Sequence, residues 1–305
     1  MDPTNRILES TFVRALAAVI AVVAGTARLV DLAFLPYPQT IQRLATAALL
    51  AVALYFSLVI LQRFALRDDA RRTYQYTAKR YGFGYDDMHV ECVIQEDGSA
   101  VVQRTVSVHA YSELRELDTF LLIPEAPPPG QNRDIEFVTI KSLTEGFDVS
   151  LADLEERFGR LSAVTVIAPP LGEGDALSFQ TVEQLPQKLY AIGLTPQDLG
   201  ARETPEDYFG WTVNRPTRKL TIQVFFPENV QRPKGYGALV RYHSPGGIPL
   251  KRIQHEEQKR IHKPLLTEQP GGRHLLQLEV EYPMIGLIYI LHWRPLELIG
   301  DREER

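Results

Sequence analysis

Cysteine is almost absent from this chain of 305 residues, in which Cys92 is the only one. A single thiol excludes an internal disulfide framework and any metal site built from several cysteines. Cys92 shares a predicted strand face with Val90 and Ile94, which favours a core residue over a nucleophile. Catalytic motifs are lacking too: there is no Gly-x-Ser-x-Gly, and His255-Glu-Glu-Gln-Lys259 ends in lysine where a zinc motif needs histidine. We therefore predict no enzyme activity, no bound metal and no cofactor.

Long apolar runs, in contrast, are present near the amino terminus. Phe12–Leu35 and Leu44–Leu61 are each about as long as a helix that crosses a bilayer, and a short proline-containing turn joins them. The pattern predicts a transmembrane helical hairpin over residues 1–66, followed by a stalk or hinge over residues 67–84. Small residues recur at a spacing of four in both runs, which favours close helix packing and a homo-oligomer in the lipid bilayer.

Two charged residues, Arg28 and Asp31, interrupt the end of the first run. Within the membrane they would form a transmembrane charge pair of the kind that serves ion passage or gating. The interpretation we favour places them at the lipid headgroups, where charge costs little. Basic residues after the second run predict a multi-pass protein of the cell inner membrane with a cytoplasmic C-terminal domain. The alternative is a cleaved signal peptide, because Arg6 and Arg14 precede the uninterrupted apolar stretch Ala15–Ala27, which ends in the small residues Gly25 and Ala27.

Beyond residue 84 the apolar pattern changes to the strict alternation of β-strands. Two such segments, His89–Ile94 and Ala100–Val108, flank an Asp-Gly turn and predict a β-hairpin. A short helix is predicted at Leu154–Phe158. The predicted fold class is a membrane-anchored all-β protein, in which the transmembrane hairpin precedes an antiparallel β-sandwich or barrel region. Its predicted β modules cover residues 85–203 and 204–298, followed by a tail over residues 299–305.

Charge is segregated along the β region, because residues 81–214 are mainly acidic and residues 215–263 mainly basic. Arginine forks and free backbone amides are the groups that bind phosphate. The candidate ligands for an anion or phosphate are Arg215, Arg218, Lys219, Arg241, His243, Lys251, Arg252 and Arg260. A nucleotide-like ligand, the anionic membrane surface, an acidic protein surface and an inert solvated face remain alternative interpretations of this block. We expect no binding of nucleic acid.

These features together predict a membrane-anchored cytoplasmic sensor or effector. Its β region would bind a ligand or partner, and oligomers of its hairpin would form a pore or disrupt the membrane. In layout the chain resembles the membrane effectors of bacterial cyclic-nucleotide antiphage systems, in which a short helical anchor precedes a cytoplasmic β-rich sensor. The alternative hypothesis is a passive membrane-tethered scaffold that binds a protein partner and has no catalytic activity.

Overall fold

The structure is a computed structural model that describes residues 48, 51–52, 54–55, 67–120, 138–157, 160–185, 190, 192, 206–242 and 251–298. The chain divides into two compact units, Met1–Arg72 and Thr73–Arg305. Within these described ranges, no helix combines the length and the apolar character that crossing a bilayer requires.

This finding corrects the predicted fold class, because the described chain is mostly β-sheet and a fold built on a transmembrane hairpin is not supported. It also contradicts the prediction that the protein acts as an effector through oligomers of that hairpin. The prediction of a multi-pass protein of the inner membrane is contradicted for the same reason. Residues Phe12–Leu35 and Leu44–Leu61, with Arg28 and Asp31, fall outside the described residues except at positions 48, 51, 52, 54 and 55.

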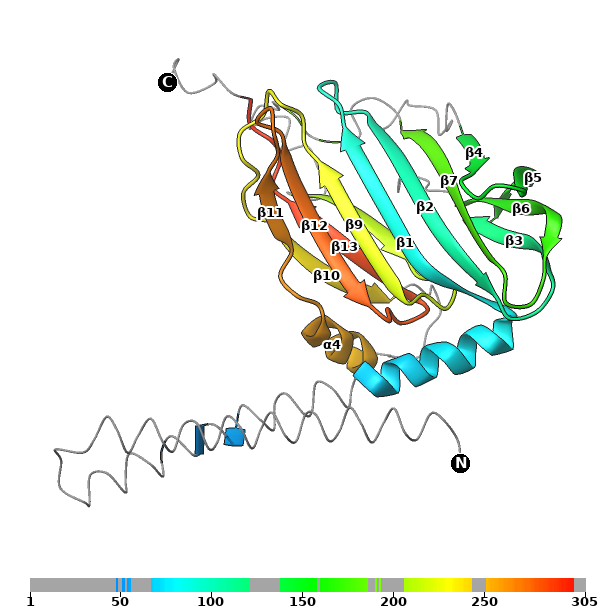
Figure 1. The fold of residues 1–305 in the computed structure, drawn as a ribbon. Helices are drawn as coiled ribbons and strands as arrows, with labels where there is room; N and C mark the ends of the chain where they lie inside the picture. The colour runs from blue at the N-terminus through cyan, green and yellow to red at the C-terminus, as the bar shows by residue number, and fades with distance from the viewer. Residues whose placement is uncertain are drawn as a thin grey trace, which may run out of the picture. The chain divides into compact units, whose positions relative to one another are not determined.

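Strands make up most of the second unit. They are β1 (Phe83–Ile94), β2 (Ala100–Ala110), β3 (Leu114–Phe120), β4 (Val138–Ser142), β5 (Asp148–Arg157), β6 (Arg160–Leu171), β7 (Ala176–Leu185), β8 (Asp207–Thr212), β9 (Lys219–Phe225), β10 (Gly237–Tyr242), β11 (Leu265–Glu268), β12 (His274–Glu281) and β13 (Leu287–Trp293), with the helix α4 (Lys251–Arg260) between β10 and β11. A seven-stranded sheet has the order β11-β12-β9-β1-β2-β7-β4, and two three-stranded sheets have the orders β10-β13-β8 and β3-β6-β5. Figure 1 shows the sheet of β10, β13 and β8 behind the large sheet, and the sheet of β3, β6 and β5 at its right-hand end next to β7.

The predicted hairpin is confirmed by β1 and β2, which pair from Phe83 with Ala110 to Ile94 with Ala100. Its turn includes Gly98, whose φ of 77° is a conformation that other residues rarely adopt. Alternation along both strands directs one face into a continuous apolar core that also includes Trp211 and Trp293. The core interpretation of Cys92 is therefore confirmed.

One other expectation differs from the structure. The predicted helix at Leu154–Phe158 is wrong, because residues 148–157 form β5. Pairing of β5 with β6 supplies cross-strand contacts that outweigh a weak local helix preference. The seven-stranded sheet also takes strands from both predicted modules, since β9 lies between β12 and β1. It pairs in parallel with β1, from Leu220 beside Met88 to Phe225 beside Val93.

A helix over residues 67–81 precedes the sheet and ends at Gly82, which has a φ of 80°. Tyr74 and Ala78 of this helix are buried. The Tyr74 hydroxyl lies 3.3 Å from Oδ1 of Asp86, so the helix contacts the start of β1. Close approach depends on Gly84, because a Cβ atom there would lie 2.8 Å from the Tyr74 hydroxyl oxygen.

Candidate functional site

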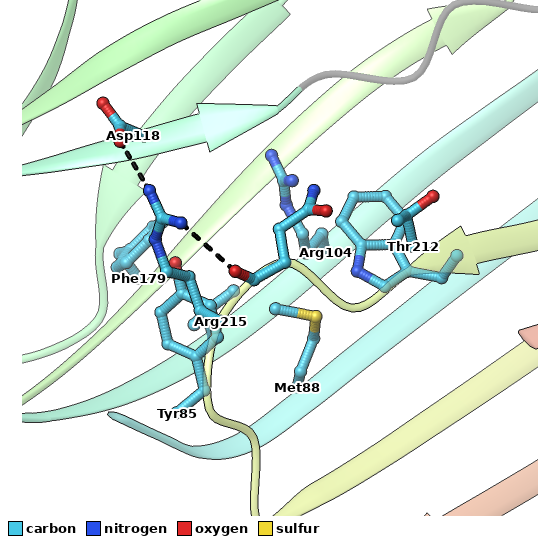
Figure 2. A pocket seen from close by; sticks show the side chains of 10 residues that line it. Tyr85, Met88, Arg104, Asp118, Phe179, Thr212 and Arg215 are labelled. Atoms are coloured by element: carbon cyan, nitrogen blue, oxygen red, sulfur yellow. Dashed lines mark hydrogen bonds and ion pairs between the residues drawn. The ribbon is translucent and has the colours of Figure 1, made fainter. Parts of the chain in front are cut away.

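A small cavity of about 30 Å³ lies where the three sheets meet. Strands β8 and β3 are the edges of the two small sheets, and both contribute to its wall together with β1, β2 and β7 of the large sheet. The lining residues, several of them labelled in Figure 2, are Tyr85, Met88, Arg104, Val106, Asp118, Phe179, Trp211, Thr212, Asn214 and Arg215. Because two arginines dominate its polar lining, we call it the arginine cavity.

Arg104 is a charged residue on the core-facing side of β2, and only 3% of it is exposed. Its Nε donates to Oγ1 of Thr181 at 3.0 Å, and its Nη2 donates to Oε1 of Glu183 at 3.3 Å. The guanidinium carbon also lies 4.9 Å from the centre of the Trp211 ring, within the range of a cation–π contact. Burial lowers the pKa of Arg104, and the nearby Glu183 carboxylate raises it again. Since guanidinium stays protonated in proteins, the cavity wall carries a positive charge.

Arg215 approaches the same cavity from the loop that follows β8, and Figure 2 shows its guanidinium between Asp118 and the backbone next to it. Its Nη2 donates to Oδ2 of Asp118 at 2.5 Å, and its Nη1 donates to the carbonyl oxygen of Asn214 at 3.1 Å. The Tyr81 ring lies 5.6 Å from the guanidinium carbon. The buried Nε of Arg215 has no hydrogen-bond partner among the described residues. Two hydrogen bonds thus hold the arginine in place, and its buried Nε donor is unused.

Tyr85 is a further polar residue in the wall of the arginine cavity. Burial raises the pKa of its hydroxyl, and the positive charges of Arg104 and Arg215 act in the opposite direction. The phenol is therefore protonated at neutral pH and can donate a hydrogen bond. A cavity with two guanidinium groups and a hydroxyl donor is suited to binding a small anion.

The structure distributes the predicted phosphate ligands over several elements. Arg218 pairs with Asp86 at 3.5 Å, Lys219 with Glu279 at 3.4 Å and Arg260 with Glu257 at 2.6 Å. Arg241 is exposed on β10, Lys251 and Arg252 belong to α4, and His243 lies outside the described residues. Within this group Arg215 lines the arginine cavity. A shared phosphate site for the whole group stays a prediction.

Sequence reasoning missed Arg104 and Glu183, although a signal was present. The predicted strand Ala100–Val108 alternates, and Arg104 falls on the same face as Val102 and Val106. A charged residue on a core-facing position is rarely buried without a partner. This break in the alternation pointed to a buried ion pair and hence to the cavity.

The remaining chemistry of the described residues is limited. No three His, Cys, Asp or Glu side chains in the described ranges are grouped so that they could hold a metal ion. The thiol of Cys92 lies 3.6 Å from the Tyr190 hydroxyl, and burial raises its pKa to about 12. A thiol of this kind stays protonated near neutral pH and is a poor nucleophile.

Comparison with known proteins assigns no family to the chain, because no family model and no curated protein matches it. Among solved structures, the M1 zinc metallopeptidase of Deinococcus radiodurans is 14% identical with a TM-score of 0.36, and the match covers 69% of this chain and 42% of that chain. A putative protease from Parabacteroides distasonis is 8% identical with a TM-score of 0.39, and covers 70% and 40%. The chain thus spans less than half the length of these proteins. Similarity at this level does not assign an activity to the chain.

Proposed function

We propose that the β region is a non-enzymatic binding module, which takes up a small anionic group of a partner in the arginine cavity. The observation that carries this proposal is the unused Nε donor of Arg215, buried beside a cavity that also holds the Arg104 guanidinium. A buried donor without an acceptor costs about 1–3 kcal/mol. Such groups are rare in native proteins, and a missing ligand atom, ion or water commonly explains them.

The size of the cavity limits what can enter it. A volume of about 30 Å³ corresponds to roughly two water-sized spheres. Pockets for whole ligands such as nucleotides are larger, at about 300–1,000 Å³. The cavity therefore favours one charged group at the end of a longer partner, rather than a whole nucleotide.

The two arginines are held in fixed positions, which also favours binding. Arg104 is fixed by Thr181 and Glu183, and Arg215 by Asp118 and the carbonyl of Asn214. Because the donors are ordered before the anion arrives, less conformational entropy is lost on binding. Guanidinium groups stay protonated near neutral pH and cannot act as a base. They are therefore suited to recognition rather than to acid–base catalysis.

The test uses Trp211 as an optical reporter at the cavity wall. Trp293 is the second tryptophan of the chain, and Trp293→Phe removes its emission. The Nε1 of Trp293 makes no hydrogen bond within the described residues, so this substitution removes no hydrogen bond. The full-length Trp293→Phe protein is titrated with acetate or phosphate at constant ionic strength. We expect a saturable change in the emission of Trp211. An anion at about ten times its Kd should also raise the free energy of unfolding by about 1.4 kcal/mol.

Two further substitutions give the matched comparison. Arg215→Gln removes a guanidinium from the cavity and should abolish the change in emission. Arg218→Gln removes an exposed arginine three positions away, which pairs with Asp86 outside the cavity, and should leave the change intact. An equal response in both variants would refute the proposed function.

A further inference from the structure

We propose that the group taken up by the arginine cavity is a carboxylate of a protein partner, and that Asp118 occupies its place on Arg215 until the partner binds. This inference rests on the proposed function and names the ligand of the same site. In the structure Asp118 is the carboxylate at the cavity wall, paired with Arg215.

The first argument is the unequal burial of the two partners. The Arg215 side chain is 19% exposed, whereas the Asp118 side chain is 62% exposed. A mostly exposed carboxylate is well hydrated and contributes little net free energy to an ion pair. The arginine, being largely buried, depends more strongly on having an anionic partner. Asp118 can therefore be replaced at little cost, provided that another anion takes its place.

The second argument is the incomplete use of the guanidinium edge. The Nε–H and one Nη2–H of an arginine point in the same direction, and a carboxylate with two oxygens can accept both hydrogen bonds. Asp118 accepts from Nη2, while Nε on the same edge remains without an acceptor in the described chain. A carboxylate that binds both donors would satisfy the buried Nε. Asp118 thus fills half of a site whose geometry matches a bidentate carboxylate.

The third argument is size. A carboxylate end group places two oxygens in the cavity, which fits a volume of roughly two water-sized spheres. A tetrahedral phosphate carries four oxygens and needs more room. Aspartate and glutamate side chains and the C-terminal carboxylate of a peptide all present the required group.

The experiment removes the internal carboxylate and supplies an external one. Acetate and phosphate are titrated separately into full-length Asp118→Ala, carrying Trp293→Phe as the reporter background, and binding is followed by Trp211 emission and by the melting temperature. We expect acetate to bind Asp118→Ala at least tenfold more tightly than the parent, because the competing side chain is gone. Asp118→Asn is the second variant, since it keeps the shape of the side chain if the alanine protein folds poorly. Asp86→Ala removes the carboxylate partner of the exposed Arg218 and should leave acetate binding at the parent value.

The outcomes separate the two proposals. If phosphate binds Asp118→Ala as tightly as acetate does, or if acetate binds the variants no more tightly than the parent, the carboxylate inference is wrong and the binding module stands. If neither anion binds any of the proteins, both proposals fail.

Peptides then distinguish the sources of the carboxylate. One peptide carries a single internal glutamate and an amidated C-terminus, and the other carries glutamine and a free C-terminus. Binding of the first to Asp118→Ala identifies an acidic side chain as the ligand, and binding of the second identifies a chain terminus. Failure of both peptides, where acetate binds, would overturn the assignment to a protein partner.

Discussion

Removing the charge of Glu183 should be among the most damaging single changes in the β region. The Arg104 and Glu183 side chains are 4% and 1% exposed, so neither charge can be hydrated when its partner is lost. Breaking a buried ion pair by removing one partner costs about 3–5 kcal/mol. Glu183→Gln keeps the shape and a hydrogen-bond acceptor for Nη2 of Arg104, so its cost reports mainly the loss of the charge.

The assay is a double-mutant cycle in urea with Arg104→Met, Glu183→Gln and the combined variant. Each single substitution should lower the free energy of unfolding by about 4 kcal/mol. With a denaturant dependence of about 3 kcal/mol per molar urea, the midpoint should fall by about 1.3 M. The combined variant leaves no unpaired charge, so it should cost little more than one single substitution, which gives a coupling energy of about 3 kcal/mol.

A matched exposed pair serves as the control. Lys219 and Glu279 lie 3.4 Å apart with side chains 39% and 50% exposed, so Lys219→Met and Glu279→Gln should each cost less than about 1 kcal/mol. Additive costs in the Arg104 and Glu183 cycle, within about 0.5 kcal/mol, would refute the reasoning that the two buried charges compensate each other.

Three further predictions follow from other contacts. Burial raises the pKa of Cys92 to about 12 from 9.0, so the stability that the protonated thiol contributes is complete well below pH 9 and is lost as the pH rises towards 12. The free energies of unfolding from urea titrations at pH 9 and 10 should differ by about 1 kcal/mol, and by less in Cys92→Ala. Oε1 of Gln258 accepts from the Val240 amide at 2.7 Å, and its Nε2 donates to the Ala238 carbonyl at 3.1 Å. Gln258→Ala should lower the free energy of unfolding by about 1–3 kcal/mol. It should also promote self-association through the edge of β10, which sedimentation velocity would detect. Gly84→Ala should lower stability by about 1–3 kcal/mol and speed tryptic cleavage within residues 67–81, because the new Cβ would lie 2.9 Å from Cβ of Ala78.

The strands were predictable where one face of a sheet is buried and the other is not. Alternation identified β1 and β2, since each has a clear core-facing side. It did not identify β10 or β11, which are short edge strands, nor β5, which was expected in part as a helix. Such strands are defined by their neighbours more than by their own residues. The order of strands, above all the parallel pairing of β1 with β9, depends on contacts between segments more than a hundred residues apart, which no local pattern encodes.

The candidate site was predictable only in part, for a related reason. The sequence singled out Arg215 because it opens a basic block, but neighbours in that block point to different carboxylates once folded. Arg104 lies far from the block in sequence and reaches the cavity only because β2 and β8 meet across the core. Charge clustering along a chain indicates total charge, whereas a binding site requires convergence in space.

The arginine cavity lies where the three sheets meet. Substitutions there can distinguish a role of Arg104 in folding from a role in anion binding. The large sheet is covered by two small sheets whose edge strands, β8 and β3, both border the cavity, so long side chains are needed to fill the junction. Methionine at position 104 can fill much of the volume that arginine fills, and glutamine at position 183 removes the need for a counter-charge. The combined variant of Arg104→Met and Glu183→Gln should therefore cost little more stability than either single substitution and lose most of the affinity for anions. A protein that needed the buried arginine only for packing would bind acetate equally well with and without it, and that result would remove Arg104 from the binding site.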